Sequence, residues 1–374
     1  MDKIFTIIEK KFQHIVMEGT HYEIGRFQGE ILRKREEVIK PLTADKMNFE
    51  KIGFNNFEEM HATFDEHCPG INDELQGMAD VLDLNLERSP LYFYSFTFPN
   101  NCSQMAALAP VTKNNHILVG RSYEWNLEDD DFRLCTTRVK GKPAYIGFTV
   151  FMTGRLDGVN EYGLSVTFTG GGIFGRQTSS KGFVPSVTIR ALLENCKSTT
   201  DAVKKIEKMP QWGFNNFLIV DKKGEGAIIE YADGEMGIKR VNNDSEEKLL
   251  FQTNHYNFPE TKGYNKFNVG ILNQSKNRYE IIQTKLEKAT PNITKETIRE
   301  ILSKRYPEGV CDHLYSQFFG TTWSMLFDLT SMEIEICFGA PTHNEWQSFT
   351  LDDPIGEKEY LGICPDEQVK EWPY

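Results

Sequence analysis

The sequence predicts an α+β fold in which antiparallel sheets carry helices on their outer faces. Up to about residue 100, apolar residues recur mainly at helical spacing. After residue 102, short apolar runs alternate with turn signals, which is typical of strands. Strands and helices then follow one another in blocks rather than in strict β-α alternation, and this arrangement favours antiparallel sheets. We therefore expect a change of architecture near residue 100.

The region before residue 100 is expected to be mainly helical. Thr20 and Glu23 form a capping box at the start of a helix that Pro41 ends. Apolar residues at helical spacing mark two further helices between residues 57 and 82. Residues 91–98 are strongly aromatic and predict a strand directly before the Asn-rich turn.

The region after residue 102 opens with a predicted β-hairpin. A strand begins at Cys102, residues 113–115 supply the turn, and a second strand follows from residue 116. Buried strands are expected at 147–151 and 217–220, and helices at 183–196, 200–208, 275–289 and 294–303.

Composition excludes several classes of function. The 374 residues carry a net charge of −12, which repels nucleic acid and anionic membranes. The first residues are too few and too charged for a signal peptide, and no apolar run approaches a membrane span. The seven scattered cysteines contain no CxxC pair. We therefore expect reduced thiols in a cytoplasmic protein, with no disulfide framework and no zinc site.

Several short segments occur in an order that resembles a known family. They are GTHYEIG at 19–25, NCS at 101–103, GRSYEW at 120–125, DGVNEYGL at 157–164, TNH at 253–255 and NRY at 277–279. Together they resemble the penicillin acyltransferase-like family of cysteine N-terminal-nucleophile (Ntn) hydrolases, which are relatives of the bile salt hydrolases and penicillin V acylases. The resemblance runs from about residue 19 to the FGAP segment at 338–341.

The resemblance implies a four-layer αββα sandwich and a chain that cuts itself between Asn101 and Cys102. Residues 1–101 would then be a mainly helical propeptide or α-subunit, and residues 102–374 the catalytic domain. A cut at this bond places a new α-amino group on the same residue as the thiol. Its reference pKa of about 7.7–8.0 suits a general base near neutral pH.

The same resemblance assigns roles to residues on the second hairpin strand. Arg121 would stabilise the Cys102 thiolate, and Glu124 would orient the α-ammonium group. The family usually has Asp where this chain has Glu124, and Asn where it has Ser122. The longer Glu side chain shifts the carboxylate, so a simple strand-end salt bridge with Arg121 is the alternative interpretation.

An acyl transfer also requires hydrogen-bond donors for the tetrahedral oxyanion. The resemblance places a backbone N–H near Thr169 and Gly170, where relatives carry Asn instead of Gly170, and a side-chain donor at Asn254. Arg278 would pair with Glu124 or with the substrate. The alternatives are a flexible glycine loop at 170–172 and an ordinary surface cation at Arg278.

His255 raises the alternative of a papain-like Cys–His pair. The residues around Cys102 do not resemble those of papain, and His255 directly follows Asn254, which already has a role. We therefore expect His255 to support the site or to line the pocket.

These expectations predict hydrolysis or transfer of the acyl group of a small N-acyl amide through a Cys102 thioester, with no metal and no organic cofactor. An acyl-CoA-dependent N-acyltransferase, a catalytically silent binding protein of the same fold and a thiol redox protein are the alternatives. The absence of a nearby resolving cysteine argues against the redox protein. The expected partner is a small-molecule N-acyl amide, without nucleic acid or membrane, and self-association is left open.

Overall fold

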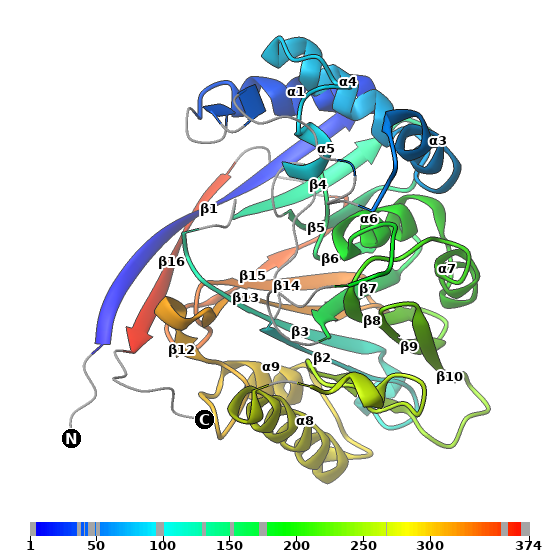
Figure 1. The fold of residues 1–374 in the computed structure, drawn as a ribbon. Helices are drawn as coiled ribbons and strands as arrows, with labels where there is room; N and C mark the ends of the chain where they lie inside the picture. Colours follow the sequence, from blue (N-terminus) through cyan, green and yellow to red (C-terminus); the bar gives the residue numbers. More distant parts are fainter. Residues whose placement is uncertain are drawn as a thin grey trace.

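Two stacked β-sheets form the centre of the molecule in the computed structural model (Figure 1). The structure describes residues 5–35, 39–40, 42–43, 49, 53–94, 101–128, 132–149, 153–171, 178–266, 268–352 and 358–367. The larger sheet has nine strands in the order β10-β9-β8-β7-β6-β5-β4-β1-β16. The smaller has seven, in the order β11-β2-β3-β13-β14-β15 with β12 paired to β13.

The nine-stranded sheet is antiparallel except where β1 and β4 pair in parallel. Its strands are β1 (Phe5–Gly19), β4 (Arg133–Val139), β5 (Tyr145–Thr149), β6 (Asp157–Asn160), β7 (Leu164–Gly170), β8 (Phe214–Asp221), β9 (Gly226–Ala232), β10 (Glu235–Val241) and β16 (Lys358–Glu367).

The seven-stranded sheet contains the predicted hairpin as β2 and β3, joined through the 3-10 turn η2 (Lys113–Asn115). Its strands are β2 (Asn101–Ala107), β3 (Leu118–Trp125), β11 (Leu249–Gln252), β12 (His313–Leu314), β13 (Phe319–Asp328), β14 (Glu333–Phe338) and β15 (Trp346–Phe349).

Helices cover the outer faces of both sheets (Figure 1). The nine-stranded sheet is covered by α6 (Pro185–Asn195) and α7 (Thr199–Ile206), and the seven-stranded sheet by α8 (Val269–Ala289) and α9 (Lys295–Ser303). A large apolar core fills the space between the sheets, and a second core lies beneath α8 and α9. The four-layer α+β sandwich is therefore confirmed. The four helices lie close to their predicted ranges, except that α8 begins at Val269, six residues before the expected start at 275.

The N-terminal region also holds the predicted helices, which pack on a separate core with α6. They are α1 (His21–Leu32), with the predicted capping box at Thr20, α3 (Phe57–His67), α4 (Ile71–Leu82) and the short α5 (Leu91–Tyr94). The first helix ends at Leu32, earlier than the expected stop at Pro41, which lies outside the described residues.

Two expectations for the N-terminal region are wrong. The strand expected at 91–98 begins as helix α5, because Tyr92 packs edge-on against Phe64 in the core of the N-terminal helices. Residues 95–98 lie outside the described residues. The second difference is β1, a strand of 15 residues that the sequence analysis did not predict. Its pairing partner β16 lies at the other end of the chain, so no local pattern indicates it.

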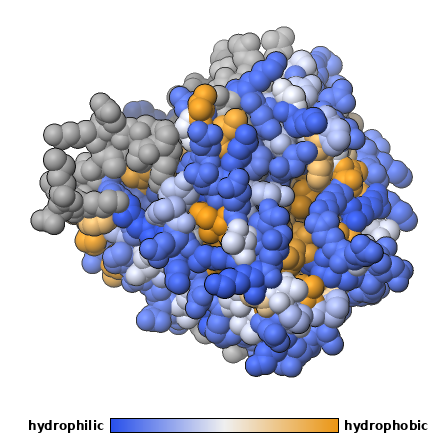
Figure 2. All heavy atoms as spheres, turned by 90° about the horizontal axis from the view of Figure 1, so that it is seen from below, coloured by the Kyte–Doolittle hydropathy of each residue, from blue (hydrophilic) through white to orange (hydrophobic). Residues whose placement is uncertain are grey.

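The outer surface is mostly hydrophilic on the face that Figure 2 shows, with hydrophobic residues in separate patches. Within the described residues, no helix is both long and apolar enough to cross a lipid bilayer.

Candidate active site

The hairpin register places Cys102 opposite Tyr123 and Asn101 opposite Glu124. Side chains alternate between the two faces of a strand, so residues three apart point to opposite faces. Arg121 therefore points into the space between the sheets, as Cys102 does, whereas Glu124 points toward α8. The two charged groups act on the thiol from opposite sides of the sheet rather than side by side.

Arg121 is completely buried and forms an ion pair with Asp157 of β6, with 3.1 Å between Nε and Oδ2. The Asp157 carboxylate also accepts hydrogen bonds from the Trp323 indole (3.0 Å) and the Phe148 backbone N–H (3.0 Å). Asp157 thus anchors Arg121 beside Cys102. Sequence reasoning gave Asp157 no role, although it begins the DGVNEYGL segment, because the partners lie 36 residues apart on different sheets.

The Cys102 side chain is fully buried in this uncut chain. Burial raises the pKa of the thiol, and the positive charge of Arg121 only partly opposes that effect. The thiol is therefore protonated at neutral pH, so a nucleophilic attack by Cys102 requires a group that takes its proton.

Asn254 and Arg278 converge on the Cys102 backbone. The Cys102 N–H donates to Asn254 Oδ1 (3.3 Å), and the Arg278 guanidinium donates both to the same oxygen (2.7 Å) and to the Cys102 carbonyl (2.8 Å). Two donors at Oδ1 define which way the Asn254 amide points. Two residues that the sequence separates widely from Cys102 therefore meet it in space, and their roles in catalysis stay predictions.

The expected oxyanion residues lie next to this group. Asn254 Nδ2 donates to the Gly170 carbonyl (2.9 Å), and the Thr169 hydroxyl donates to the Thr253 carbonyl (2.6 Å). The backbone N–H of Gly171 bonds the Phe214 carbonyl (2.8 Å). In the intact chain these groups thus hydrogen-bond other groups of the same protein. Their role as hydrogen-bond donors to an oxyanion stays a prediction.

Glu124 is buried between β3 and α8. Burial raises the pKa of its carboxyl to about 7, although the charge of Arg278 and the hydroxyls of Ser122 and Thr321 act in the opposite direction. Oε1 accepts from Ser122 and from Thr321 (3.1 Å). Oε2 has no hydrogen-bond partner among the described residues. A buried acceptor without a partner is costly.

His255 does not form the papain-like arrangement. Its Nδ1 lies 3.0 Å from the Ser275 hydroxyl and 3.1 Å from the Thr253 hydroxyl. Burial, with the charges of Arg278 and Lys276, lowers the pKa of the imidazole to about 4, so the ring is neutral at pH 7. The ring therefore supports the Asn254 loop, in line with the expectation.

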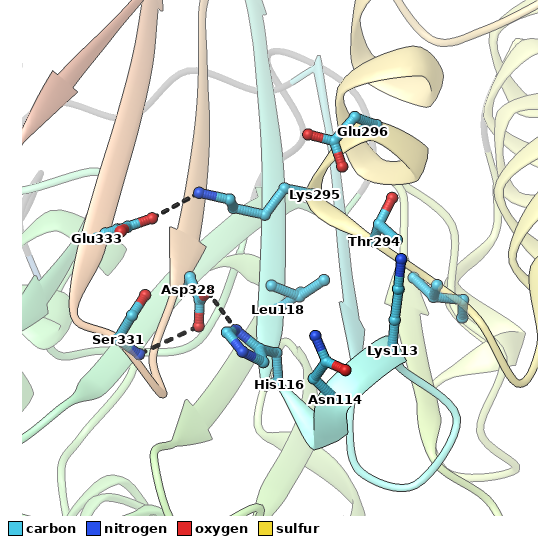
Figure 3. A pocket seen from close by; sticks show the side chains of 11 residues that line it. Lys113, Asn114, His116, Leu118, Thr294, Lys295, Glu296, Asp328, Ser331 and Glu333 are labelled. Atoms are coloured by element: carbon cyan, nitrogen blue, oxygen red, sulfur yellow. Dashed lines mark hydrogen bonds and ion pairs between the residues drawn. The ribbon is translucent and has the colours of Figure 1, made fainter.

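A cavity of about 340 Å³ lies at the other end of the hairpin, around its turn (Figure 3). His116 Nδ1 and Asp328 Oδ2 lie 2.6 Å apart there, within hydrogen-bond distance. The cavity is lined by Leu118, which lies five residues along β3 from Tyr123 and hence roughly 17 Å from the level of Cys102. This cavity is therefore separate from the candidate site.

A comparison with protein families covers most of the residues of this cysteine-centred cluster. The model for "Acyl-coenzyme A:6-aminopenicillanic acid acyl-transferase" matches residues 111–343, more than half of the chain. The chain belongs to this family. The match spans Arg121, Glu124, Asn254 and Arg278 and begins nine residues after Cys102.

Three solved structures align with this chain as follows. Penicillin V acylase from Agrobacterium tumefaciens aligns at 15% identity over 69% of this chain and 90% of its own, with a TM-score of 0.47. A Caenorhabditis elegans N-acylethanolamine-hydrolyzing acid amidase ortholog aligns at 17%, over 61% and 93%, with 0.40. A conjugated bile acid hydrolase variant from Clostridium perfringens aligns at 11%, over 69% and 96%, with 0.45. No curated protein sequence matches the chain.

Proposed function

We propose that this protein is a self-processing cysteine amidohydrolase or acyltransferase that acts on linear amide bonds of small N-acyl compounds. One observation carries the proposal: Cys102 lies between a buried donor and a buried acceptor that lack partners among the described residues. They are Arg121 Nη2 on one face of the sheet and Glu124 Oε2 on the other. A thiolate and an α-ammonium group on Cys102 would supply one partner for each.

Processing would begin when the Cys102 thiol attacks the Asn101 carbonyl carbon. The peptide C–N bond breaks as the C–S bond forms, and the nitrogen leaves as the α-amine of Cys102. Water then hydrolyses the thioester, releases the Asn101 carboxylate and restores the thiol. The new amine would lie against Asn254 Oδ1, which already accepts from this nitrogen in the uncut chain.

In each turnover the α-amine would take the thiol proton, and the thiolate, stabilised by Arg121, would attack the substrate carbonyl. Collapse of the tetrahedral intermediate breaks the amide C–N bond, and the α-ammonium returns its proton to the leaving amine. Asn254 Nδ2 donates to the Gly170 carbonyl, so its N–H groups lie beside the backbone at Gly170. We assign this amide and the backbone near Gly170 to the oxyanion. Water or an acceptor amine then takes the acyl group from the Cys102 thioester.

Transfer to an amine is the second candidate because the family description names an acyl-coenzyme A-dependent acyl transfer. The same thioester serves both reactions, so the partition between water and amine decides between them. We also propose a reducing, cytoplasmic location, because none of the seven cysteines, all of which lie in the described part of the chain, forms a disulfide.

Intact-mass analysis tests the processing step. The wild type should yield fragments 1–101 and 102–374, whereas Cys102→Ala should stay at the full 43.0 kDa. A panel of N-acyl amino acids, acylated amines, penicillins and bile-acid conjugates, with and without acyl-CoA, tests the reaction. A processed protein that turns over none of them, and whose Cys102 resists an acyl chloromethyl ketone, would instead be a binding protein.

A further inference from the structure

The hydroxyl of Ser275 lies at the junction between helix α8 and the loop that carries Asn254. Ser275 is buried and sits in the first turns of α8. Its Oγ lies 2.9 Å from the Asn254 backbone nitrogen and 3.1 Å from that of His255. It also lies 3.0 Å from Thr253 Oγ1 and 3.0 Å from His255 Nδ1. One hydroxyl thus contacts three successive residues of the loop.

The hydrogen-bonding capacity of a serine hydroxyl matches this environment. A hydroxyl has two acceptor lone pairs and one donor. The N–H groups of Asn254 and His255 occupy both lone pairs. The single proton then goes to Thr253 Oγ1 or to the neutral ring of His255, and Thr253 Oγ1 itself donates to the Ser275 carbonyl (2.9 Å). The loop is therefore attached to α8 by a saturated set of hydrogen bonds.

The same helix also holds the side chain of Asn254. Arg278 follows Ser275 by one helical turn and donates to Asn254 Oδ1 (2.7 Å), while Gln274 Oε1 accepts from Arg278 Nε (2.9 Å). Helix α8 thus holds Asn254 at two points, the backbone through Ser275 and the side chain through Arg278. A rigid helix that holds both fixes the distance between Asn254 and Cys102.

We infer that Ser275 is a positioning residue that sets the place of Asn254 relative to Cys102. This inference rests on the proposed function. Removing the hydroxyl leaves two buried N–H groups without their acceptor, so the loop must shift to find another. A displacement of about 1 Å at a catalytic group can cost about 10²-fold in rate.

The test is a double-mutant cycle with Asn254. Ser275→Ala should lower kcat by about 10- to 100-fold and change KM by less than about threefold. In an Asn254→Ala background the same substitution should have almost no further effect, because the residue it positions is gone. A role confined to general stability would instead lower kcat by the same factor in both backgrounds, and this result would overturn the inference.

Thr284→Ala provides the matched control, since it removes an exposed hydroxyl from the same helix away from the loop. Its kcat should equal that of the wild type. Wild-type-like turnover in Ser275→Ala would also overturn the inference. If the processed wild type has no activity on any substrate, the proposed function fails first, so the two failures are distinguishable.

Discussion

Two buried arginines of this protein, Arg121 and Arg190, differ in how completely their side-chain nitrogens are hydrogen-bonded. Arg190 of α6 is bonded through all its nitrogens: Nε to Glu194 (2.9 Å), Nη1 to Glu74 (2.7 Å) and the Thr153 carbonyl (2.8 Å), and Nη2 to Glu74. Arg121 bonds Asp157 through Nε and keeps Nη2 without a partner among the described residues. Complete pairing indicates a structural role, and incomplete pairing beside a thiol indicates chemistry.

The carboxylates near the two arginines differ in the same way. Burial acts against the charge on Glu194, but Arg190 and the side chains of His21 and Tyr145 outweigh it and hold the pKa of Glu194 well below its usual range. Burial dominates at Glu124 and raises its pKa to about 7. The first cluster joins α4 to α6 and so links the N-terminal region to the rest of the protein. The second cluster keeps the pKa of the Glu124 carboxyl close to neutral pH.

The largest effect should come from breaking the complete cluster. Arg190→Ala leaves Glu74 and Glu194 buried without their cation, which typically costs about 3–5 kcal/mol. Urea unfolding of the uncut Cys102→Ala protein, with and without Arg190→Ala, measures this loss. Arg240→Ala, which removes a half-exposed arginine paired with Glu207, is the control and should cost less than about 1 kcal/mol. Equal losses in the two variants would contradict the structural role of Arg190.

Removal of Asn254 should strongly affect catalysis. Loss of one oxyanion donor typically lowers kcat by about 10²–10³-fold, so the kcat of Asn254→Ala should fall by a factor in this range. Steady-state kinetics of the processed variant provides the measurement. An Asn254→Ala enzyme that retains wild-type kcat would show that another donor serves the oxyanion.

The ionisation of Glu124 should make stability depend on pH. Its pKa is raised from 4.5 to about 7 in the folded state, so the native protein holds a proton that the unfolded chain releases. This contribution to stability is complete below pH 4.5 and is lost as pH rises toward 7, by up to about 3 kcal/mol.

Burial lowers the pKa values of His14 and His255 to about 4, and these two groups act in the opposite direction. The effect of Glu124 is therefore measured as the difference in the free energy of unfolding between two variants of this protein. Cys102→Ala should lose stability between pH 5 and 7.5 relative to Cys102→Ala/Glu124→Gln. A constant difference across this range would show that Glu124 is already ionised.

The smallest effect concerns Arg121. In the processed enzyme, Arg121→Ala should slow iodoacetamide labelling of Cys102 at pH 7 by about tenfold, because a nearby cation raises the thiolate fraction. Peptide mapping follows all seven cysteines together, so the other six serve as the internal reference. A uniform rate change across all of them would reduce Arg121 to a structural residue.

Much of the fold was predictable because its signals are local. Helices α6 to α9 and the β2–β3 hairpin each carry their own periodicity and turn residues within a short stretch of chain. The hairpin also brings Arg121 and Glu124 near Cys102, but residues 108–117 connect its strands, so the pairing of β2 with β3 sets the register rather than a tight turn. Strand β1 escaped prediction because pairing with β16 joins the two ends of the chain.

The sequence by itself determined the block order of strands and helices and the residues that flank Cys102, because hydrophobic periodicity and strand alternation act over a few residues. The tertiary structure alone decided that Asp157 anchors Arg121 and that Arg278 and Ser275 hold Asn254. These contacts join residues on different layers, and burial between the layers sets their pKa values. No local pattern of residues encodes such distances.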